Sequence, residues 1–260
     1  MADIAKLGLF VALGHGLLTA YARRRQPQWT AALARRRLAS LALLTLAVSA
    51  VKVLEDVLAK ESGPVDEAVL WFIRAHVSAA LGPLFEAITL SGSARVLLPL
   101  AVLVTLMLCG ARRWFEAGLL GGSLLAANLL VYGLKVGVGR ARPGLWQTDW
   151  YWGSSFPSGH TLSVAAFSIA AALCVGRLWP RWTTPSMILA VLWTAAVALS
   201  RLVLGVHWPT DVLAAICLGA SLPLLASLVI DLRQTAPPMR APRQSQRPPE
   251  RSGKGRSGTR

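Results

Sequence analysis

Long runs of apolar residues, separated by short charged or glycine- and proline-containing joints, dominate this 260-residue chain. A helix needs roughly 20 mostly apolar residues to cross the hydrocarbon core of a bilayer. Six runs approach this length, at residues 38–54, 96–110, 114–134, 161–176, 185–203 and 211–230. The pattern predicts an all-α polytopic membrane protein built as a bundle of six transmembrane helices.

A further apolar stretch lies at residues 7–22. Its end, Ala20-Tyr21-Ala22, resembles the small-x-small site at which signal peptides are cleaved. Three arginines follow at once, at positions 23–25, and such a positive cluster opposes translocation. The length of the stretch and its internal glycines favour an extra N-terminal apolar helix on the membrane surface, with a short seventh span as the alternative.

The connection between the first two runs contains another apolar stretch, residues 68–90, interrupted by Arg74, His76 and Glu86. These charges favour an amphipathic helix on the outer surface over another span. His76, and likewise His15 in the N-terminal stretch, are expected at the surface or at an interface.

The chain carries 27 Lys+Arg against 12 Asp+Glu, a net charge of +15. In a membrane protein such an excess marks cytoplasmic loops and anionic lipid, so no nucleic-acid partner is expected. Basic clusters at 23–25, 35–37, 111–114 and 176–182 fall on one side of a six-span bundle. The positive-inside rule makes that side cytoplasmic, which predicts an integral membrane protein in this orientation.

The chain divides into three parts. Residues 1–37 form the N-terminal apolar helix and a basic cytoplasmic segment, and residues 38–230 form the six-span domain. Residues 231–260 are rich in Pro, Arg, Ser and Gly and are expected to be a disordered basic cytoplasmic tail. Anionic lipid is one possible partner of this tail, and an inert solubilising role is the alternative. The three cysteines, Cys109, Cys174 and Cys217, lie inside apolar runs as expected of buried thiols.

Two loops on the outer side break the positive-inside tendency. One follows the third run and the other joins the fifth run to the sixth, and their ionisable residues are Lys135, Arg140, Arg142, Arg201, His207 and Asp211. The sequence "PSGH" at 157–160 begins the fourth run on the same side. Antiparallel helices in this order bring all three segments to one membrane face, where ionisable residues are candidates for function.

Each segment alone has an ordinary interpretation. Lys135 and Arg142 can anchor lipid head groups, "PSGH" can simply start a helix, and His207 can hydrogen-bond Asp211 locally. Two of the four histidines of the chain, however, fall in these convergent segments beside three cations. Chance is a poor explanation for so many functional side chains on one membrane face.

The three cations Lys135, Arg142 and Arg201 suit a group with several anionic oxygens, namely phosphate. Ser158 can cap the fourth helix, and Gly159 allows the backbone to approach a ligand closely. The exposed N–H groups at this helix start would also face the phosphate.

The histidines add chemistry to binding. A neutral His207 can attack phosphorus while Asp211 holds its other ring nitrogen protonated. His160 can protonate the departing alkoxide and then activate water. No carboxylate cluster suited to Mg²⁺ accompanies them, so the expected reaction is independent of metal and of any other cofactor.

The three segments resemble the type-2 phosphatidic acid phosphatase family of membrane lipid phosphatases. The family pattern K-x6-R-P, P-S-G-H and S-R-x5-H-x3-D occurs here without substitution as "KVGVGRARP" (135–143), "PSGH" (157–160) and "SRLVLGVHWPTD" (200–211). The resemblance covers residues 38–230 and implies a six-helix core and a phosphohistidine intermediate. It also implies catalytic roles for His207, His160 and Asp211, and phosphate binding by Lys135, Arg142, Ser158, Gly159 and Arg201.

The expected function is therefore hydrolysis of a lipid phosphate or diphosphate by an integral membrane protein, on the face of the membrane turned away from the cytoplasm. In a bacterium this is the inner (plasma) membrane, with the active site facing the periplasm or the cell exterior. By resemblance, candidate substrates are phosphatidic acid, phosphatidylglycerophosphate, undecaprenyl diphosphate and lipid A phosphates, with outer-face chemistry favouring the carrier-lipid diphosphate. Alternatives are a lipid phosphotransferase, a vanadate-type peroxidase on the same site, or a non-catalytic lipid-binding protein.

Overall fold

The computed structural model describes residues 2–148 and 153–234, and the expected disordered tail lies almost wholly outside the described residues. Within these ranges the secondary structure is helical, and no strand occurs. The helices are α1 (Ala2–Arg25), α2 (Pro27–Arg35), α3 (Arg37–Leu58), α4 (Gly63–His76), α5 (Gly82–Ser91), α6 (Ala94–Gly110), α7 (Trp114–Val138), α8 (Gly159–Leu178), α9 (Thr183–Val203) and α10 (Pro209–Gln234). Short 3₁₀ turns at Ala79–Leu81 and Pro180–Trp182 precede α5 and α9.

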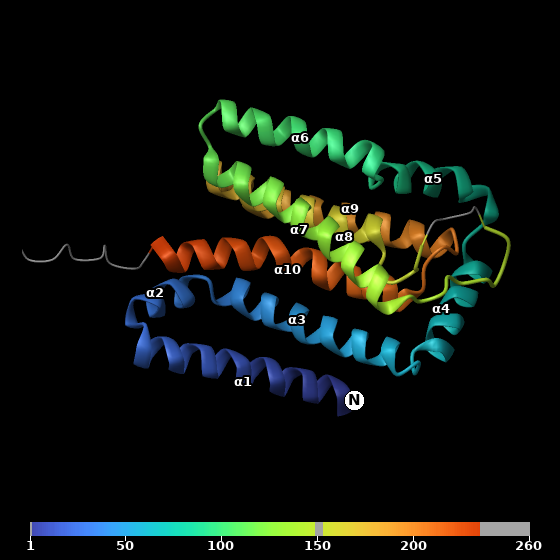
Figure 1. Cartoon of the computed structure of the whole chain (residues 1–260), viewed down its shortest axis with the longest axis horizontal. Coiled ribbons are helices and arrows are strands. Elements are labelled where there is room, and N and C mark those ends of the chain that lie inside the picture. The colour runs from blue at the N-terminus through green and yellow to red at the C-terminus, as the bar shows by residue number, and fades with distance from the viewer. Residues whose placement is uncertain (1, 149–152, 235–260) are drawn as a thin grey trace, which may run out of the picture.

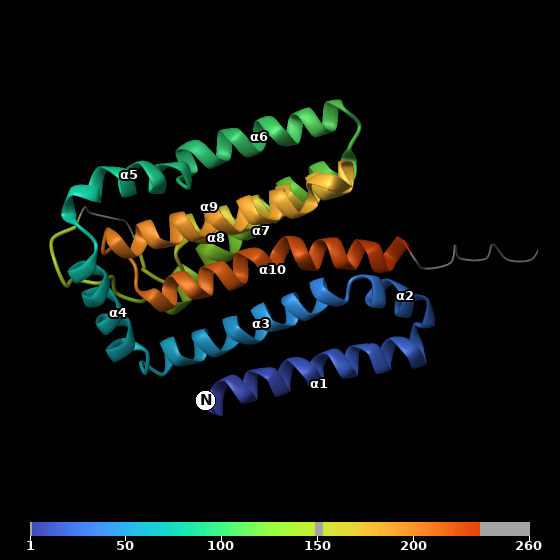
Figure 2. The same ribbon diagram turned by 180° about the vertical axis from the view of Figure 1, so that it is seen from behind.

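Six helical stretches of the described chain are long and apolar enough to cross a membrane, which confirms the predicted six-span bundle. They are Arg37–Leu58, Ala79–Gly110, Trp114–Val138, Gly159–Leu178, Pro180–Val203 and Pro209–Arg233. They run roughly parallel to one another along the long axis of the molecule (Figure 1). Consecutive spans are antiparallel, so alternate joints lie at the same end of the bundle (Figures 1 and 2).

Helix α8 is the centre of the bundle and packs against α7, α9 and α10. Most of its side chains are buried, and many of them are small. The contact with α10 is especially close, because a Cβ added at Gly219 would lie 2.5 Å from the carbonyl oxygen of Leu162. Small residues at such crossings let helix backbones approach each other in a membrane.

The second span differs from the sequence prediction. The stretch 68–90 is not one surface helix, because the structure divides it between α4, which crosses the end of the bundle, and α5, which leads into α6 (Figure 1). The break between α5 and α6 falls at Gly92, where an added Cβ would lie 2.9 Å from Val164 and from Val197. The run at 96–110 is thus only the second part of this span. The first part of this span, Ala79–Ser91, does not stand out as an apolar run in the sequence, because Glu86 interrupts it.

Helix α1 lies antiparallel alongside α3 at the edge of the bundle (Figures 1 and 2). This confirms an extra N-terminal apolar helix in addition to the six spans. His15 on α1 is half-buried, and His76 on α4 is exposed, as expected for residues outside the bundle core.

The basic joints gather at the end of the bundle where α2 lies (Figure 1). Asp231 near the end of α10 pairs there with Arg36 at 2.8 Å and with Arg177 at 3.4 Å. The loops that carry the three motifs are therefore at the opposite end.

Candidate active site

The first motif begins in the last turn of α7. Gly139 ends the helix with a positive φ of 62° and donates its N–H to the carbonyl of Lys135. Such a left-handed residue at a helix C-terminus is usually glycine, because other residues are strained there. The reversal directs the following chain, including Arg140 and Arg142, across the end of the bundle.

The loop before α8 packs directly on this segment. Ser155 donates its N–H to the carbonyl of Arg140 at 2.8 Å, and Lys135 Nζ donates to the carbonyl of Ser154. Hydrogen bonds therefore hold the first motif to the loop that leads into the second motif before any substrate binds.

Ser158 occupies the N-cap position of α8, but its hydroxyl makes no cap hydrogen bond, contrary to the predicted capping role. Ser158 Oγ pairs instead with Thr161 Oγ1 at 3.0 Å, and the Ser158 N–H donates to the carbonyl of Asp211 at 3.2 Å. This last bond ties the start of α8 to the start of α10. Gly159 and His160 follow in the first turn and are half-buried.

The third motif begins in the last turn of α9 with Ser200 and Arg201, and Arg201 is only 1% exposed. Its Nη1 donates to Thr89 Oγ1 on α5 at 2.6 Å. The chain then turns at Gly205, where a Cβ would meet the Trp146 indole at 2.5 Å. His207 follows, and α10 starts at Pro209, a residue suited to a first helical turn.

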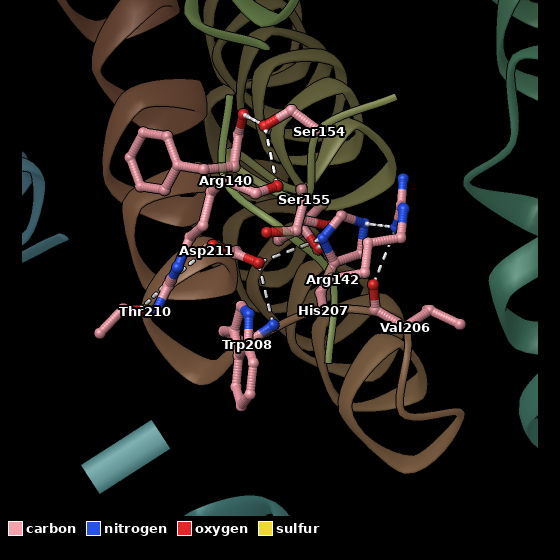
Figure 3. Close-up of polar contacts among 12 residues, drawn as sticks. Arg140, Arg142, Ser154, Ser155, Val206, His207, Trp208, Thr210 and Asp211 are labelled. Atoms are coloured by element: carbon pink, nitrogen blue, oxygen red, sulfur yellow. Dashed lines mark hydrogen bonds and ion pairs between the residues drawn. The ribbon is translucent and has the colours of Figure 1, made fainter. Parts of the chain in front are cut away.

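His207 lies between Asp211 and Arg142 (Figure 3). Its Nδ1 is 3.5 Å from Asp211 Oδ2, at the outer limit of a hydrogen bond, and its Nε2 is 3.4 Å from Arg142 Nη1. A proton on Nδ1 that faces the carboxylate leaves the Nε2 lone pair directed toward the cations. Asp211 is fully buried and His207 is 2% exposed.

The surroundings of His207 favour its neutral form. Burial lowers the pKa of His207 to about 4, and the positive charges of Arg201 and Arg142 act in the same direction. The nearby carboxylate of Asp211 opposes this change without cancelling it. At neutral pH the imidazole therefore keeps an unprotonated nitrogen, which a nucleophile requires.

The other candidate residues converge on this pair. Electrostatic interactions link His160 to His207, Arg201, Arg142 and Lys135. The candidate site residues thus lie where α7 and α9 end and where α8 and α10 begin, at one end of the bundle: Lys135, Arg142, Ser158, Gly159, His160, Arg201, His207 and Asp211.

Three residues near the site received no role from the sequence. Arg140 does not join the phosphate-binding candidates, because its guanidinium binds Asp211 Oδ1 at 2.8 Å and Asp66 Oδ2 at 2.6 Å. Asp66 comes from α4, and Thr89, the partner of Arg201, comes from α5. Asp66 could have been noticed in the sequence, because it is an acidic residue at the start of a largely apolar helix. Nothing in the sequence pattern distinguishes Thr89 from other threonines.

A cavity of about 180 Å³ opens beside His160. It lies among α6, α7 and α8 at the break before α6, and its lining is largely apolar: Leu97, Leu98, Leu124, Val131 and Gly159. Among residues 2–148 and 153–234, no group of three or more His, Cys, Asp or Glu side chains is placed to hold a metal ion.

Residues 116–234 match the PAP2 superfamily. The chain is 39% identical to phosphatidylglycerophosphatase B of Escherichia coli (strain K12) over 82 residues, which are 32% of this chain and 30% of that protein. It is 34% identical to lipid A 1-phosphatase of Rhizobium johnstonii over 117 residues, 41% of this chain and 45% of that protein. The chain thus aligns with less than half the length of either relative.

The fold is similar to a crystal structure of a transmembrane PAP2 type phosphatidylglycerolphosphate phosphatase from Bacillus subtilis. That likeness has a TM-score of 0.61 and 26% identity, and it covers 69% of this chain and 94% of the other. The matched segment contains all three motifs, and the bundle around it has the architecture of a PAP2 phosphatase. The chain therefore matches the PAP2 superfamily over residues 116–234, and it resembles a PAP2 phosphatase in fold.

Proposed function

We propose that this protein is an integral-membrane phosphatase that hydrolyses a lipid phosphate or diphosphate through a phosphohistidine intermediate. The observation that carries the proposal is the placement of His207, whose Nδ1 faces Asp211 and whose Nε2 faces Arg142. A neutral imidazole with one nitrogen held by a carboxylate and the other beside a cation is arranged for attack on an anionic phosphate.

In the first step, Nε2 of His207 attacks the terminal phosphorus and forms the N–P bond, while the P–O bond to the lipid breaks, or the P–O bond to the inner phosphate in a diphosphate. The departing alkoxide, or the departing lipid phosphate when the substrate is a diphosphate, takes a proton from His160. The phosphorylated His207 ring carries a positive charge, which Asp211 stabilises.

In the second step, His160 removes a proton from water, and the resulting hydroxide attacks phosphorus. The N–P bond breaks, its electron pair returns to Nε2, and inorganic phosphate leaves. His160 is again protonated and His207 again neutral, so the cycle is closed without an external acid or base.

Lys135, Arg142 and Arg201 stabilise the negative charge that spreads over the phosphoryl oxygens in the transition state. Arg201 is buried and held by Thr89, so its guanidinium is oriented before substrate binds. These cations supply the charge stabilisation that a magnesium ion provides in many phosphoryl-transfer enzymes, and we propose that the reaction is independent of metal.

A lipid substrate is supported by the position of the site at the end of a membrane-spanning bundle and by the apolar cavity that reaches His160. Relatives named for phosphatidylglycerophosphate, lipid A and decaprenylphosphoryl-phosphoribose all act on a phosphate attached to a lipid. The basic joints at the opposite end support an extracytoplasmic site, since arginine-rich joints are retained in the cytoplasm.

The decisive experiment measures phosphate release from a panel of purified lipid phosphates and diphosphates in detergent micelles. We expect His207→Ala to abolish release while the protein remains in the membrane fraction. His76→Ala is the matched control, because this exposed histidine on α4 lies outside the site, and it should retain wild-type activity. Wild-type turnover by His207→Ala would refute the proposed nucleophile.

A further inference from the structure

Asp66 is a buried carboxylate that the reaction described above does not use. It lies in the first turn of α4, is 0% exposed, and precedes the segment matched to the PAP2 superfamily. A buried charge is costly unless it is paired and hydrogen-bonded, so its partners indicate why it is there.

The partners of Asp66 belong to the two outer loops of the site. Oδ2 accepts from Arg140 Nη2 at 2.6 Å and from Thr210 Oγ1 at 2.7 Å, and Oδ1 accepts from the Thr210 N–H at 2.9 Å. Thr210 is in the first turn of α10, whose N–H groups lack partners within the helix. Asp66 therefore caps α10 from a different helix, one residue before Asp211.

Arg140 carries this contact to the catalytic carboxylate. Its Nη2 binds Asp66, and its Nη1 binds Asp211 Oδ1 at 2.8 Å (Figure 3). A guanidinium is planar, with its donors in a fixed arrangement, so the orientation of one carboxylate constrains the other. Arg140 also lies over the Trp208 ring at 5.4 Å, which restricts its rotation.

The remaining oxygen of Asp211 is the one that faces His207. Oδ2 accepts from the Trp208 N–H at 2.9 Å and lies 3.5 Å from His207 Nδ1. Because that second distance is at the limit of a hydrogen bond, a small rotation of the carboxylate makes or breaks the interaction.

We propose that Asp66 is a positioning residue for the reaction, which through Arg140 and Thr210 fixes the carboxylate of Asp211 and thereby the reactive orientation of His207. The proposal rests on the phosphatase function proposed above. The sequence pattern predicts only a peripheral helix on the outer surface in this region. Under the proposal, α4 instead supplies a residue that orients the nucleophile His207.

The test uses the full-length protein in detergent with the most active lipid phosphate of the panel. Asp66→Asn keeps the size of the side chain and an oxygen for the Thr210 N–H, but it removes the charge that holds Arg140. We expect kcat to fall on the order of 10- to 100-fold, as for a displacement of about 1 Å in a reacting group. KM should change by less than about twofold, because the phosphate-binding cations are untouched.

The matched control is Glu67→Gln, the same charge removal one residue away on the exposed side of α4, and it should retain wild-type kcat. Arg140→Lys is the second variant. It keeps a positive charge but cannot span both carboxylates, so it should show the same loss of kcat.

A double mutant separates positioning from simple stabilisation. If Asp66 acts through Asp211, Asp66→Asn should lower the residual kcat of Asp211→Asn by less than about twofold. An equal loss in both backgrounds, a loss confined to KM, or a wild-type kcat in Asp66→Asn would each overturn the inference. Those results leave the phosphatase function intact when His207→Ala is inactive, whereas an active His207→Ala removes the function itself.

Discussion

The neutral state of His207 leads to a testable prediction for the pH dependence of the proposed reaction. Burial and two neighbouring cations lower the pKa of His207 to about 4, so the nucleophile becomes protonated only as the pH falls through that value. The group loses its reactive lone pair on the acid side, and its ionisation does not limit activity above about pH 5.

The expected size of the effect follows from the fraction of neutral imidazole. With a pKa of about 4, about 90% of His207 is neutral at pH 5, compared with nearly all of it at pH 7. With an ordinary pKa of about 6.5, only about 3% would be neutral at pH 5, a decrease of about 25-fold from pH 7.

The direct assay is NMR titration of ¹⁵N-histidine-labelled protein in micelles. The His207 resonances are assigned by their absence in His207→Gln, and the other three histidines serve as internal references. Arg142→Gln should move the midpoint of His207 upward, because it removes the cation 3.4 Å from Nε2. A midpoint near 6.5 in the wild-type protein would refute the argument that burial and cations hold this imidazole neutral.

Three further predictions concern the metal, the phosphate site and the helix packing. EDTA should leave phosphate release unchanged, and loss of activity that Mg²⁺ restores would contradict the site as described. Thr89→Val should raise KM about tenfold with little change in kcat, since the Arg201 guanidinium loses an oriented, charge-assisted partner at 2.6 Å; unchanged kinetics would mean that its other contacts suffice. Gly219→Ala should destabilise the protein by about 1–3 kcal/mol, because its Cβ would lie 2.5 Å from the Leu162 carbonyl oxygen. The control Gly118→Ala, which meets nothing within 4 Å, should not lower the melting temperature in detergent, and equal melting temperatures for both variants would refute the packing argument.

Much of the architecture is encoded locally. Runs of about 20 apolar residues must form helices in a bilayer, because no other backbone arrangement satisfies their hydrogen bonds within one segment. Because consecutive spans are antiparallel, the number of spans before a joint decides on which side of the membrane that joint lies. The three motifs are therefore expected on the same side from the order of the spans alone. The roles expected for Lys135, His160 and His207 come from residue type and from this shared face.

The second span was not predictable in the same way. Glu86 and the Gly82-Pro83 pair interrupt the apolar pattern of residues 68–90, so the pattern alone resembles a surface helix. In the structure the broken span is accommodated because Gly92 allows close contact with Val164 and Val197 on two other helices. Contacts between distant helices, rather than local propensity, decide where this span begins.

The supporting contacts of the site also required tertiary structure. Asp66 and Arg140 are separated by 74 residues, and Thr89 and Arg201 by 112. No helical periodicity relates positions so far apart in the sequence. A single carboxylate or threonine in a helix can also simply face solvent or hydrogen-bond to nearby backbone. The sequence alone determined which side chains could perform the chemistry and on which face they meet. Only packing of α4 and α5 against α9 and α10 decided which residues hold them in place, because that depends on distances between elements that the chain order leaves open.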